Sequence, residues 1–278
     1  MIDLDALAQA AACLDPLPAT VVRLAALVAS DAADLGEITE IVSYDQALTA
    51  GVLRAANSSW SASRNPVTTV KDAVVRLGSA TVLSMALDVN VRGRLQVALP
   101  EYGLAEGDLW KHSVAASLAG EMLQRHARVA VPSEAVAASL LHDVGKLLMA
   151  RFLDTDLLEA LERAHVEGGL SRMAAEAELL GVHHGELGGL VAQDWGLPDG
   201  IVIGIAYHHD PDTCDDTIAY VTHLADCIAK VVVPTVGDNG DIEAFAHSVE
   251  HLGLDADDYD MVCSVVAARF DEVTGRFG

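Results

Sequence analysis

The sequence is short of basic residues. Lysine and arginine number 17 against 41 aspartates and glutamates, so the 278 residues carry a formal net charge of −24. An acidic surface repels nucleic-acid phosphates and anionic lipid headgroups, because contact between like charges raises the free energy. The composition therefore argues against direct nucleic-acid binding and against binding to a membrane, and we expect a partner of another kind.

Cysteines and long apolar runs are also scarce. The four cysteines form no CxxC pair and show no zinc-ligand spacing. No apolar run reaches the roughly 18 residues that indicate a membrane span. The first residues are acidic and lack the basic region of a signal peptide. Together these absences predict a cytoplasmic protein with reduced thiols.

Aliphatic residues at helical spacing are abundant. Hydrophobic residues make up 51% of the chain and aromatic residues only 4%, and alanine and leucine are strong helix formers. Apolar residues recur at i, i+3, i+4 and i+7, and no stretch alternates long enough to indicate a strand. The sequence therefore predicts an all-α fold. We expect helices at about 21–28, 35–42, 48–53, 70–77, 79–90, 108–126, 133–145, 154–168, 171–181, 185–195, 198–207, 218–233 and 256–273.

The helical periodicity is lost over residues 93–107, which contain three glycines and a proline. Because these residues interrupt helices, we place a boundary there. The prediction is an N-terminal helical subdomain over residues 1–95 packed on a second helical subdomain over 105–278. Trp60, in the polar segment 57–68, either packs into the core, which we favour, or is an exposed contact anchor for a partner.

A set of histidines and aspartates in the second half is the main candidate for chemistry. We place its members on separate helices, so that a helical bundle can bring them to one pocket. Imidazole nitrogens and carboxylate oxygens together suit iron, manganese, zinc or nickel better than calcium. The set consists of His112, His142, Asp143, His184, His208, His209 and Asp226.

The segment LLHDVGK, residues 140–146, is the most informative part of this set. A helix end lets the adjacent His142 and Asp143 both face inward. A carboxylate can span two cations, so Asp143 is predicted to bridge two metal ions. Lys146 follows one turn later, where it can meet a phosphate oxygen.

Other interpretations stay open for single members of the set. A helical histidine among alanines, such as His112, is more often a packed core residue. Asp226 lies among apolar residues, where an unpaired carboxylate is costly, so a salt bridge is as good an interpretation as a metal ligand. All the histidines could be core residues, but that does not explain so many metal-type side chains.

Several segments of the chain occur in an order that is typical of one protein family. Those segments are LDPLPATVVRLAALVASDAADLGEITEIVSYDQALTAGVLRAANSS, VTTVKDAVVRLG, LWKHSVAASLA, LLHDVGKLL, HHGELGGLVAQDWGLP, AYHHDP and HLADCIA. Over about residues 14–235 the chain resembles HDOD proteins, a bacterial branch of the HD-domain phosphohydrolase superfamily. The resemblance implies an N-terminal helical subdomain packed on an HD-type helical bundle, and a role in signal transduction or regulation.

The resemblance also extends to the candidate site. By similarity to the HD-GYP cyclic-dinucleotide phosphodiesterases, the seven histidines and aspartates fall on metal-ligand positions, and Lys146 matches the lysine that faces phosphate. This implies one or two divalent transition metals, iron or manganese first and zinc or nickel next. After His208 and His209 the chain reads DPDTCDDT, without the Gly-Tyr-Pro loop of those enzymes. That departure weakens the expectation of cyclic-di-GMP hydrolysis.

Two functions follow from these observations. The first is a regulatory module, in which the bundle holds a metal or a small nucleotide as a sensor and the protein contacts a signalling partner. The alternative is a metal-dependent phosphohydrolase or phosphodiesterase that acts on a nucleotide or cyclic dinucleotide, with Asp143 and Lys146 as catalytic residues. The complete ligand set favours the enzyme, whereas the missing loop and the acidic surface favour the module. The oligomeric state stays open.

Overall fold

The computed structural model describes residues 14–30, 34–58, 66–234 and 242–275, and Trp60 lies outside them. Within these ranges the chain is helical and has no strand, which confirms the predicted all-α fold. The α-helices are α2 (Ala19–Val28), α3 (Leu35–Tyr44), α4 (Gln46–Ala56), α5 (Val70–Leu77), α6 (Ser79–Leu95), α7 (Asp108–His126), α8 (Glu134–Leu141), α9 (Gly145–Met149), α10 (Thr155–Val166), α11 (Arg172–Leu180), α12 (His184–Asp194), α13 (Asp199–Ala206), α14 (Thr217–Val232), α15 (Ile242–His251) and α16 (Ala256–Thr274). Two short 3-10 helices are η2 (Pro100–Tyr102) and η3 (Pro211–Thr213).

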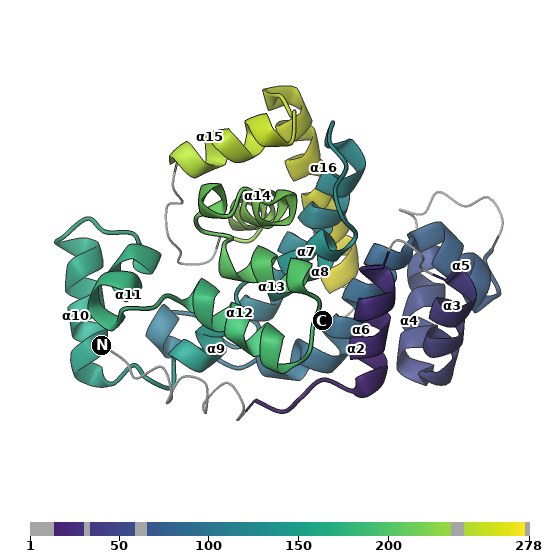
Figure 1. Ribbon diagram of the computed structural model, residues 1–278, viewed down its shortest axis with the longest axis horizontal. Helices are drawn as coiled ribbons and strands as arrows, with labels where there is room; N and C mark the ends of the chain where they lie inside the picture. The colour runs from purple at the N-terminus through teal and green to yellow at the C-terminus, as the bar shows by residue number, and fades with distance from the viewer. Residues whose placement is uncertain (1–13, 31–33, 59–65, 235–241, 276–278) are drawn as a thin grey trace.

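The helices form an N-terminal group and a larger bundle. Helices α2 to α5 lie at one side of the molecule, and α10 and α11 lie at the opposite side (Figure 1). Helix α7 runs through the bundle and packs against α8, α14 and α16, while α12 packs against α9 and α13. Helix α6 joins the two groups, because it contacts α2, α4 and α5 on one side and α7 and α8 on the other.

One hydrophobic core runs through both groups. Leu24 of α2, Leu83 of α6 and Leu140 of α8 are almost fully buried members of the same cluster. Burial of a leucine side chain contributes about 1.5–3 kcal/mol to folding. The N-terminal helices are therefore held on the bundle by shared apolar packing.

Polar side chains cap several of the predicted helix starts. Asp45 accepts a hydrogen bond from the backbone N–H of Leu48 at 2.9 Å, which satisfies a donor that the helix itself leaves unpaired. Asp34 and Glu37 have the three-residue spacing that predicts a capping box, but the structure has no capping box at this helix start. Asp34 accepts from the N–H of Gly36, and Glu37 pairs with Arg23 of α2 instead.

The structure differs from the sequence prediction at two places. Helix α6 continues through Gly93 to Leu95, so the irregular segment begins only at Gln96. Helix α15 was not predicted, because it is short and follows a polar segment. Its Phe245 and Val249 are partly buried against the core, so tertiary packing supports it.

The length and hydrophobicity of the described helices indicate whether any of them could cross a membrane. None of the described helices is by itself long and apolar enough to cross a membrane. Helices α5 and α6 pass that test only as a pair, and they are bent by 108° where they join.

Candidate metal centre

The structure brings the seven predicted side chains and Lys146 into one cluster inside the bundle. Helices supply only part of it, so the expectation of one separate helix for each ligand is not met. His112 lies on α7, Asp226 on α14 and His184 at the start of α12, whereas His142–Asp143 follow α8 and His208–His209 follow α13. Side chains at helix ends can turn toward a common centre because the backbone there is no longer constrained by helical geometry.

Three donors form the first group of the cluster. The Nε2 atoms of His112 and His142 lie 3.2 Å apart, and Asp226 Oδ1 lies 3.0 Å from the first and 3.4 Å from the second. Donors that share one ion at bond lengths of about 2.1 Å lie roughly 3.0–3.5 Å from each other in octahedral or tetrahedral coordination. The spacing of this group fits one metal ion.

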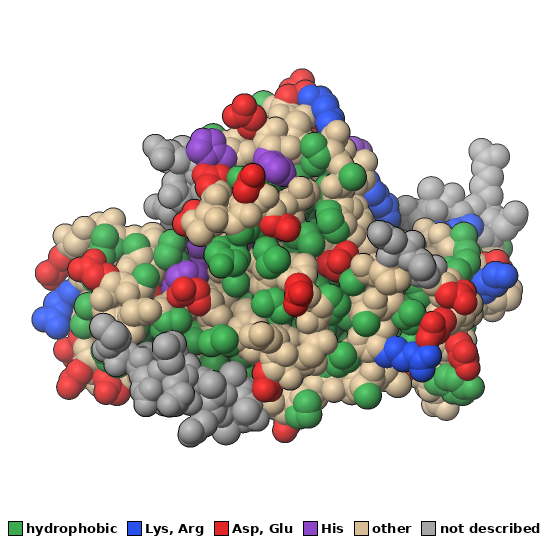
Figure 2. All heavy atoms as spheres, in the orientation of Figure 1, with side chains coloured by type: hydrophobic (Ala, Val, Ile, Leu, Met, Phe, Trp, Pro, Cys, Tyr) green, Lys and Arg blue, Asp and Glu red, His purple; other side chains and the backbone are tan. Residues whose placement is uncertain are grey.

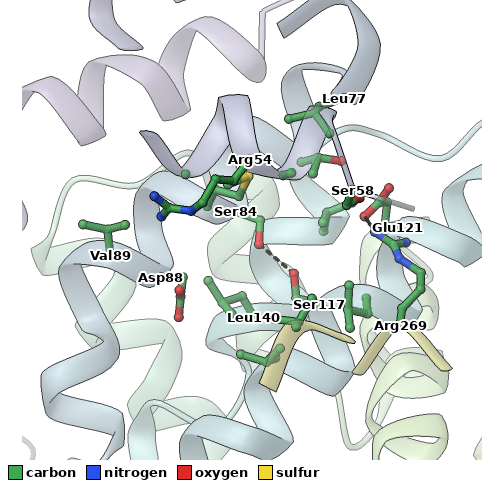
Figure 3. A pocket seen from close by; sticks show the side chains of 18 of the residues that line it. Arg54, Ser58, Leu77, Ser84, Asp88, Val89, Ser117, Glu121, Leu140 and Arg269 are labelled. Carbon is green, nitrogen blue, oxygen red and sulfur yellow. Dashed lines mark hydrogen bonds and ion pairs between the residues drawn. The ribbon is translucent and has the colours of Figure 1, made fainter. Parts of the chain in front are cut away.

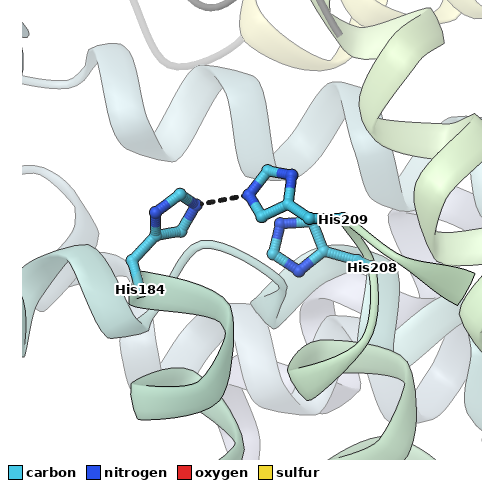
Figure 4. A group of neighbouring side chains, drawn as sticks. All are labelled: His184, His208 and His209. Carbon is cyan, nitrogen blue, oxygen red and sulfur yellow. Dashed lines mark hydrogen bonds between the residues drawn. The ribbon is translucent and has the colours of Figure 1, made fainter. Parts of the chain in front are cut away.

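A second group consists of His184, His208 and His209. One ring nitrogen of each lies within 4.8 Å of those of the other two. Figure 4 shows the three rings facing one another, with the Nε2 atoms of His184 and His209 at 2.7 Å. These three imidazoles could hold a second ion.

Asp143 lies between the two groups. Its Oδ2 is 3.4 Å from His142 Nε2 and 3.7 Å from His112 Nε2, whereas its Oδ1 is 3.4 Å from His184 Nε2. The two oxygens of one carboxylate therefore face different histidine groups. A carboxylate that bridges two cations needs this orientation.

Hydrogen bonds on the outer side of the rings fix which nitrogen faces the centre. The Nδ1–H of His142 donates to Ser139 O at 2.8 Å, and that of His208 donates to Ile205 O at 2.7 Å. In the neutral ring each Nε2 then keeps its lone pair, which is the usual state of a metal-bound imidazole. His208 Nε2 is buried and has no hydrogen-bond partner within the described parts of the chain. A buried polar atom without a partner costs free energy, and a metal ion would satisfy it.

Glu176 orients His184 in the same way. It is fully buried, and its Oε2 accepts from His184 Nδ1 at 2.7 Å and from the His184 backbone N–H at 2.8 Å. The hydroxyl of Tyr102 donates to its other oxygen at 2.9 Å. Burial disfavours the carboxylate, but His184 and Tyr102 prevail and lower the pKa of Glu176. The sequence analysis did not identify Glu176 or Tyr102 as part of the site. Nothing in the segment RMAAEAELL distinguishes Glu176 from an exposed glutamate.

Two lysines pair with the two aspartates. Lys146 Nζ lies 2.7 Å from Asp143 Oδ2, and Lys230 Nζ lies 2.7 Å from Asp226 Oδ2. The predicted salt bridge of Asp226 is present at Oδ2, whereas Oδ1 faces the histidines and its role as a metal ligand stays a prediction. Sequence reasoning did not include Lys230, although its i+4 spacing from Asp226 was a usable signal.

Burial and charge set the protonation of the cluster. Burial works against ionisation of both aspartates, but the neighbouring lysines and histidines hold the pKa of Asp143 and of Asp226 well below its usual range. Burial also opposes protonation of His142, yet Asp143 and Asp226 raise its pKa to about 9. Burial and nearby histidines lower the pKa of His208 well below its usual value. The metal-free cluster thus mixes anionic, cationic and neutral groups.

A cavity of about 280 Å³ opens onto the cluster. Besides the candidate ligands, it is lined by the cationic side chains of Lys146, Arg172 and Lys230. The Arg172 guanidinium lies 5.1 Å from the centre of the Tyr102 ring. Asp143, Glu162 and Asp226 also line it, so basic and acidic side chains are equal in number, and Arg172 Nη1 lies 3.7 Å from Glu162 Oε2. The cavity is therefore locally less negative than a protein with a net charge of −24 is as a whole, which lowers the repulsion of an anionic ligand.

A close helix contact supports the centre. Gly145 begins α9, and a Cβ atom at this position would overlap the carbonyl oxygen of His184 at the start of α12. Only glycine lets the two backbones approach this closely. The contact places Asp143, two residues before Gly145, beside His184.

Comparison with known sequences gives one family. The model of the HDOD domain matches residues 14–211. An uncharacterized protein of Treponema pallidum (strain Nichols) is 22% identical over 195 residues, which are 70% of this chain. The chain spans about a third of the length of that curated relative, because the match covers 37% of it.

Solved structures share the fold. An HDOD domain protein of unknown function from Geobacter sulfurreducens is 21% identical, with a TM-score of 0.69 over 97% of this chain and 99% of the other. A candidate phosphohydrolase from Shewanella amazonensis SB2B is 27% identical, with a TM-score of 0.65 over 95% and 93%. A candidate signal transduction protein from Marinobacter aquaeolei VT8 is 26% identical, with a TM-score of 0.63 over 99% of this chain and 59% of the other. With its helical fold, its His/Asp cluster and a family match over most of its length, this chain belongs to the HDOD family.

Proposed function

We propose that this protein is a signal-transduction protein whose His/Asp cluster holds two divalent metal ions and binds a phosphorylated small molecule, such as a nucleotide. The position of Asp143 carries the proposal, because its Oδ2 faces His142 and its Oδ1 faces His184, and the two adjoining donor groups meet at this carboxylate. The similar proteins from Marinobacter aquaeolei and Shewanella amazonensis are described as a signal transduction protein and a phosphohydrolase, both as candidates, which supports this choice.

The donor set limits which metals are suitable. Five imidazoles and two carboxylates favour iron or manganese, with zinc or nickel as the next choices. His112, His142 and Asp226 would hold one ion, and His184, His208 and His209 the other. Asp143 would contact both.

The three basic side chains of the cavity, Lys146, Arg172 and Lys230, favour a phosphate group as the ligand. The side chains of Lys146 and Lys230 are 19% and 25% exposed, so their ammonium groups reach the cavity while they pair with aspartates. Ammonium and guanidinium groups form strong charge-assisted hydrogen bonds with phosphate oxygens. A change in ligand occupancy would then be passed on by contact with a signalling partner protein.

Hydrolysis of the bound phosphate is the second candidate function. Metal ions in such a site supply a Lewis acid and lower the pKa of water. Lys146 would neutralise charge on the phosphoryl oxygens. Asp143 would contact both ions and so hold the two donor groups at a fixed separation. The orientation of the Asp143 carboxylate is compatible with this candidate as well, since the same geometry serves binding and catalysis.

One experiment separates these functions. Untagged protein loaded with manganese would be titrated with ADP and with pyrophosphate by calorimetry, and assayed for cleavage of bis(p-nitrophenyl) phosphate. Binding that is lost with EDTA, without cleavage, supports the signalling role. Cleavage that needs metal and is lost in Asp143→Asn supports the enzyme. Protein that takes up no metal and binds neither phosphate compound contradicts both.

A further inference from the structure

A second, larger cavity of about 860 Å³ lies between the N-terminal helices and the bundle, and we propose that it binds a single-chain aliphatic anion. Figure 3 shows this cavity, with the buried Ser84 and Ser117 hydroxyls hydrogen-bonded at 2.6 Å between α6 and α7. Its volume is within the range of about 300–1,000 Å³ that is common for small-molecule sites.

The apolar part of the lining is almost entirely aliphatic. Helix α4 contributes small residues, among them Ala50 and Gly51, which leave the space open. Among the described residues of the lining the aromatic one is Trp110, whose ring already has the Arg92 guanidinium 4.9 Å from its centre. A nucleobase would favour aromatic stacking partners, whereas an alkyl chain is satisfied by contact with aliphatic side chains. The lining therefore favours an alkyl chain over a base.

Arginines are concentrated around this apolar surface. Among the described residues, five of the 17 basic residues of the protein line the cavity together with three acidic ones, so this part of the lining is positive by two charges. The arginines are Arg54, Arg76, Arg92, Arg125 and Arg269, and the acids are Asp88, Glu121 and Glu272. In a protein with a net charge of −24, this local excess provides charge complementarity to an anion.

The acidic residues do not neutralise all of these arginines. Asp88 pairs with Arg92, while the two oxygens of Glu121 pair with Arg125 and Arg269. Among the described residues, Arg54 and Arg76 have no carboxylate within ion-pair distance. In the view of Figure 3, Arg54 of α4 and Arg269 of α16 lie at opposite ends of the cavity. Arg54 is thus available to pair with the head group of a ligand whose chain fills the apolar part.

This site is separate from the metal centre. The two cavities share no lining residue, although α7 contributes Trp110 to one and His112 to the other. Binding of an alkyl anion in this cavity is therefore independent of metal binding at the His/Asp cluster.

The test uses defined probes below their micelle-forming concentrations. Dodecanoate and dodecyl phosphate distinguish a carboxylate from a phosphate head group, dodecanol removes the charge, and AMP offers a base. We expect calorimetry to show about one equivalent of at least one alkyl anion, with dodecanol binding about tenfold more weakly because it lacks a charge-assisted hydrogen bond.

Two variants address the two parts of the site. Gly51→Leu places a side chain in the cavity, where a Cβ atom meets only Met85 at 3.4 Å, so folding should be retained. Arg54→Ala removes the head-group partner. We expect each variant to weaken alkyl-anion binding about tenfold or more. The matched control is Arg151→Ala, an exposed arginine that lines neither cavity, which should bind as the wild type does.

Several outcomes would overturn the proposal. Absence of binding of both alkyl anions to the wild type is one, and binding of AMP in their place is another. Wild-type affinity in both Gly51→Leu and Arg54→Ala would show that the anions bind elsewhere. Circular dichroism melting curves of each variant confirm that weaker binding does not come from unfolding.

Discussion

At the scale of single residues, Asp143 is the side chain on which the proposed metal centre depends. Its carboxylate is 2% exposed and lies between the two donor groups. The neighbouring imidazoles can each bind one ion, but none of them can span two. The chemistry of the centre is therefore most sensitive to this one carboxylate.

We predict that Asp143→Asn removes most of both metal ions while the protein still folds. Asparagine keeps the shape and one acceptor oxygen but loses the charge and the second strong donor. The measurement is elemental analysis of untagged protein, with about two equivalents expected for the wild type. Asp194→Asn, which removes an exposed carboxylate on α12, is the control and should keep its metal. Retention of two equivalents in Asp143→Asn would refute the bridging role.

The protonation of His142 gives a pH-dependent prediction. Its pKa is raised to about 9, so the metal-free protein carries this proton at neutral pH. A metal can bind Nε2 only after the proton leaves, so binding near pH 7.5 should release protons, and the affinity should rise toward pH 9. Calorimetry in two buffers of different ionisation enthalpy counts the protons released. Equal heats in both buffers would contradict the raised pKa.

The same group affects the stability of the metal-free protein in the opposite direction. A pKa that is higher in the folded state than the usual 6.5 stabilises the fold below about pH 6.5. This contribution disappears as the pH rises through about 9. The metal-free and metal-bound proteins should therefore respond differently to alkaline pH.

At the scale of helices, the centre depends on close packing between short elements. Helix α9 begins at Gly145, where the backbone meets the start of α12. Ala115 and Ala116 of α7 pack on Ala229 of α14, so alanines let the helices that carry His112 and Asp226 approach each other. Small residues thus determine the distances between the donors.

Gly145→Ala should destabilise the protein by about 2–3 kcal/mol, because the added methyl overlaps the α12 backbone and forces the two helices apart. Gly93→Ala is the matched control. This glycine is exposed within α6 and a Cβ atom there meets nothing within 4 Å, so the variant should gain about 0.5–1 kcal/mol. Urea unfolding midpoints compare the two. Equal stability of Gly145→Ala and the wild type would show that α9 can move without cost.

At the scale of the whole molecule, negative charge dominates the surface. Figure 2 shows acidic side chains spread over the visible face and few basic ones. Repulsion among like charges destabilises a compact state, and salt screens it over about 8–10 Å near physiological ionic strength. Exposed ion pairs such as that of Arg128 with Asp255 offset little of this repulsion, because water and salt screen them.

We therefore predict that the melting temperature rises by several degrees when sodium chloride is increased from about 20 mM to about 300 mM at constant pH. Differential scanning fluorimetry provides the measurement. Potassium chloride should give the same rise if ionic strength is the cause. A melting temperature that falls with salt would indicate that attractive ion pairs outweigh the net repulsion.

The positions of most helices and the residues able to bind a metal could be predicted from the sequence, because both are local properties. The spacing of apolar residues within ten positions identifies a helix such as α2, and histidine or aspartate is a metal-type donor wherever it lies. Helix α15 escaped prediction because it depends on packing more than on its own pattern. The Asp34–Glu37 spacing predicts a capping box that is absent, because Glu37 forms an ion pair with Arg23 of α2.

Convergence of the donors was decided by tertiary structure. His112 and Asp226 are 114 positions apart yet lie 3.0 Å from each other. Hydrogen bonds from the Nδ1–H groups of His142 and His208 to the carbonyl oxygens of Ser139 and Ile205 decide which ring nitrogens face inward, and Glu176 accepts the corresponding bond from His184. The sequence by itself determined an all-helical chain with donors for a metal site. Only packing of distant helices, which no local pattern encodes, decided the division into two donor groups around Asp143 and created the arginine-lined cavity beside α4.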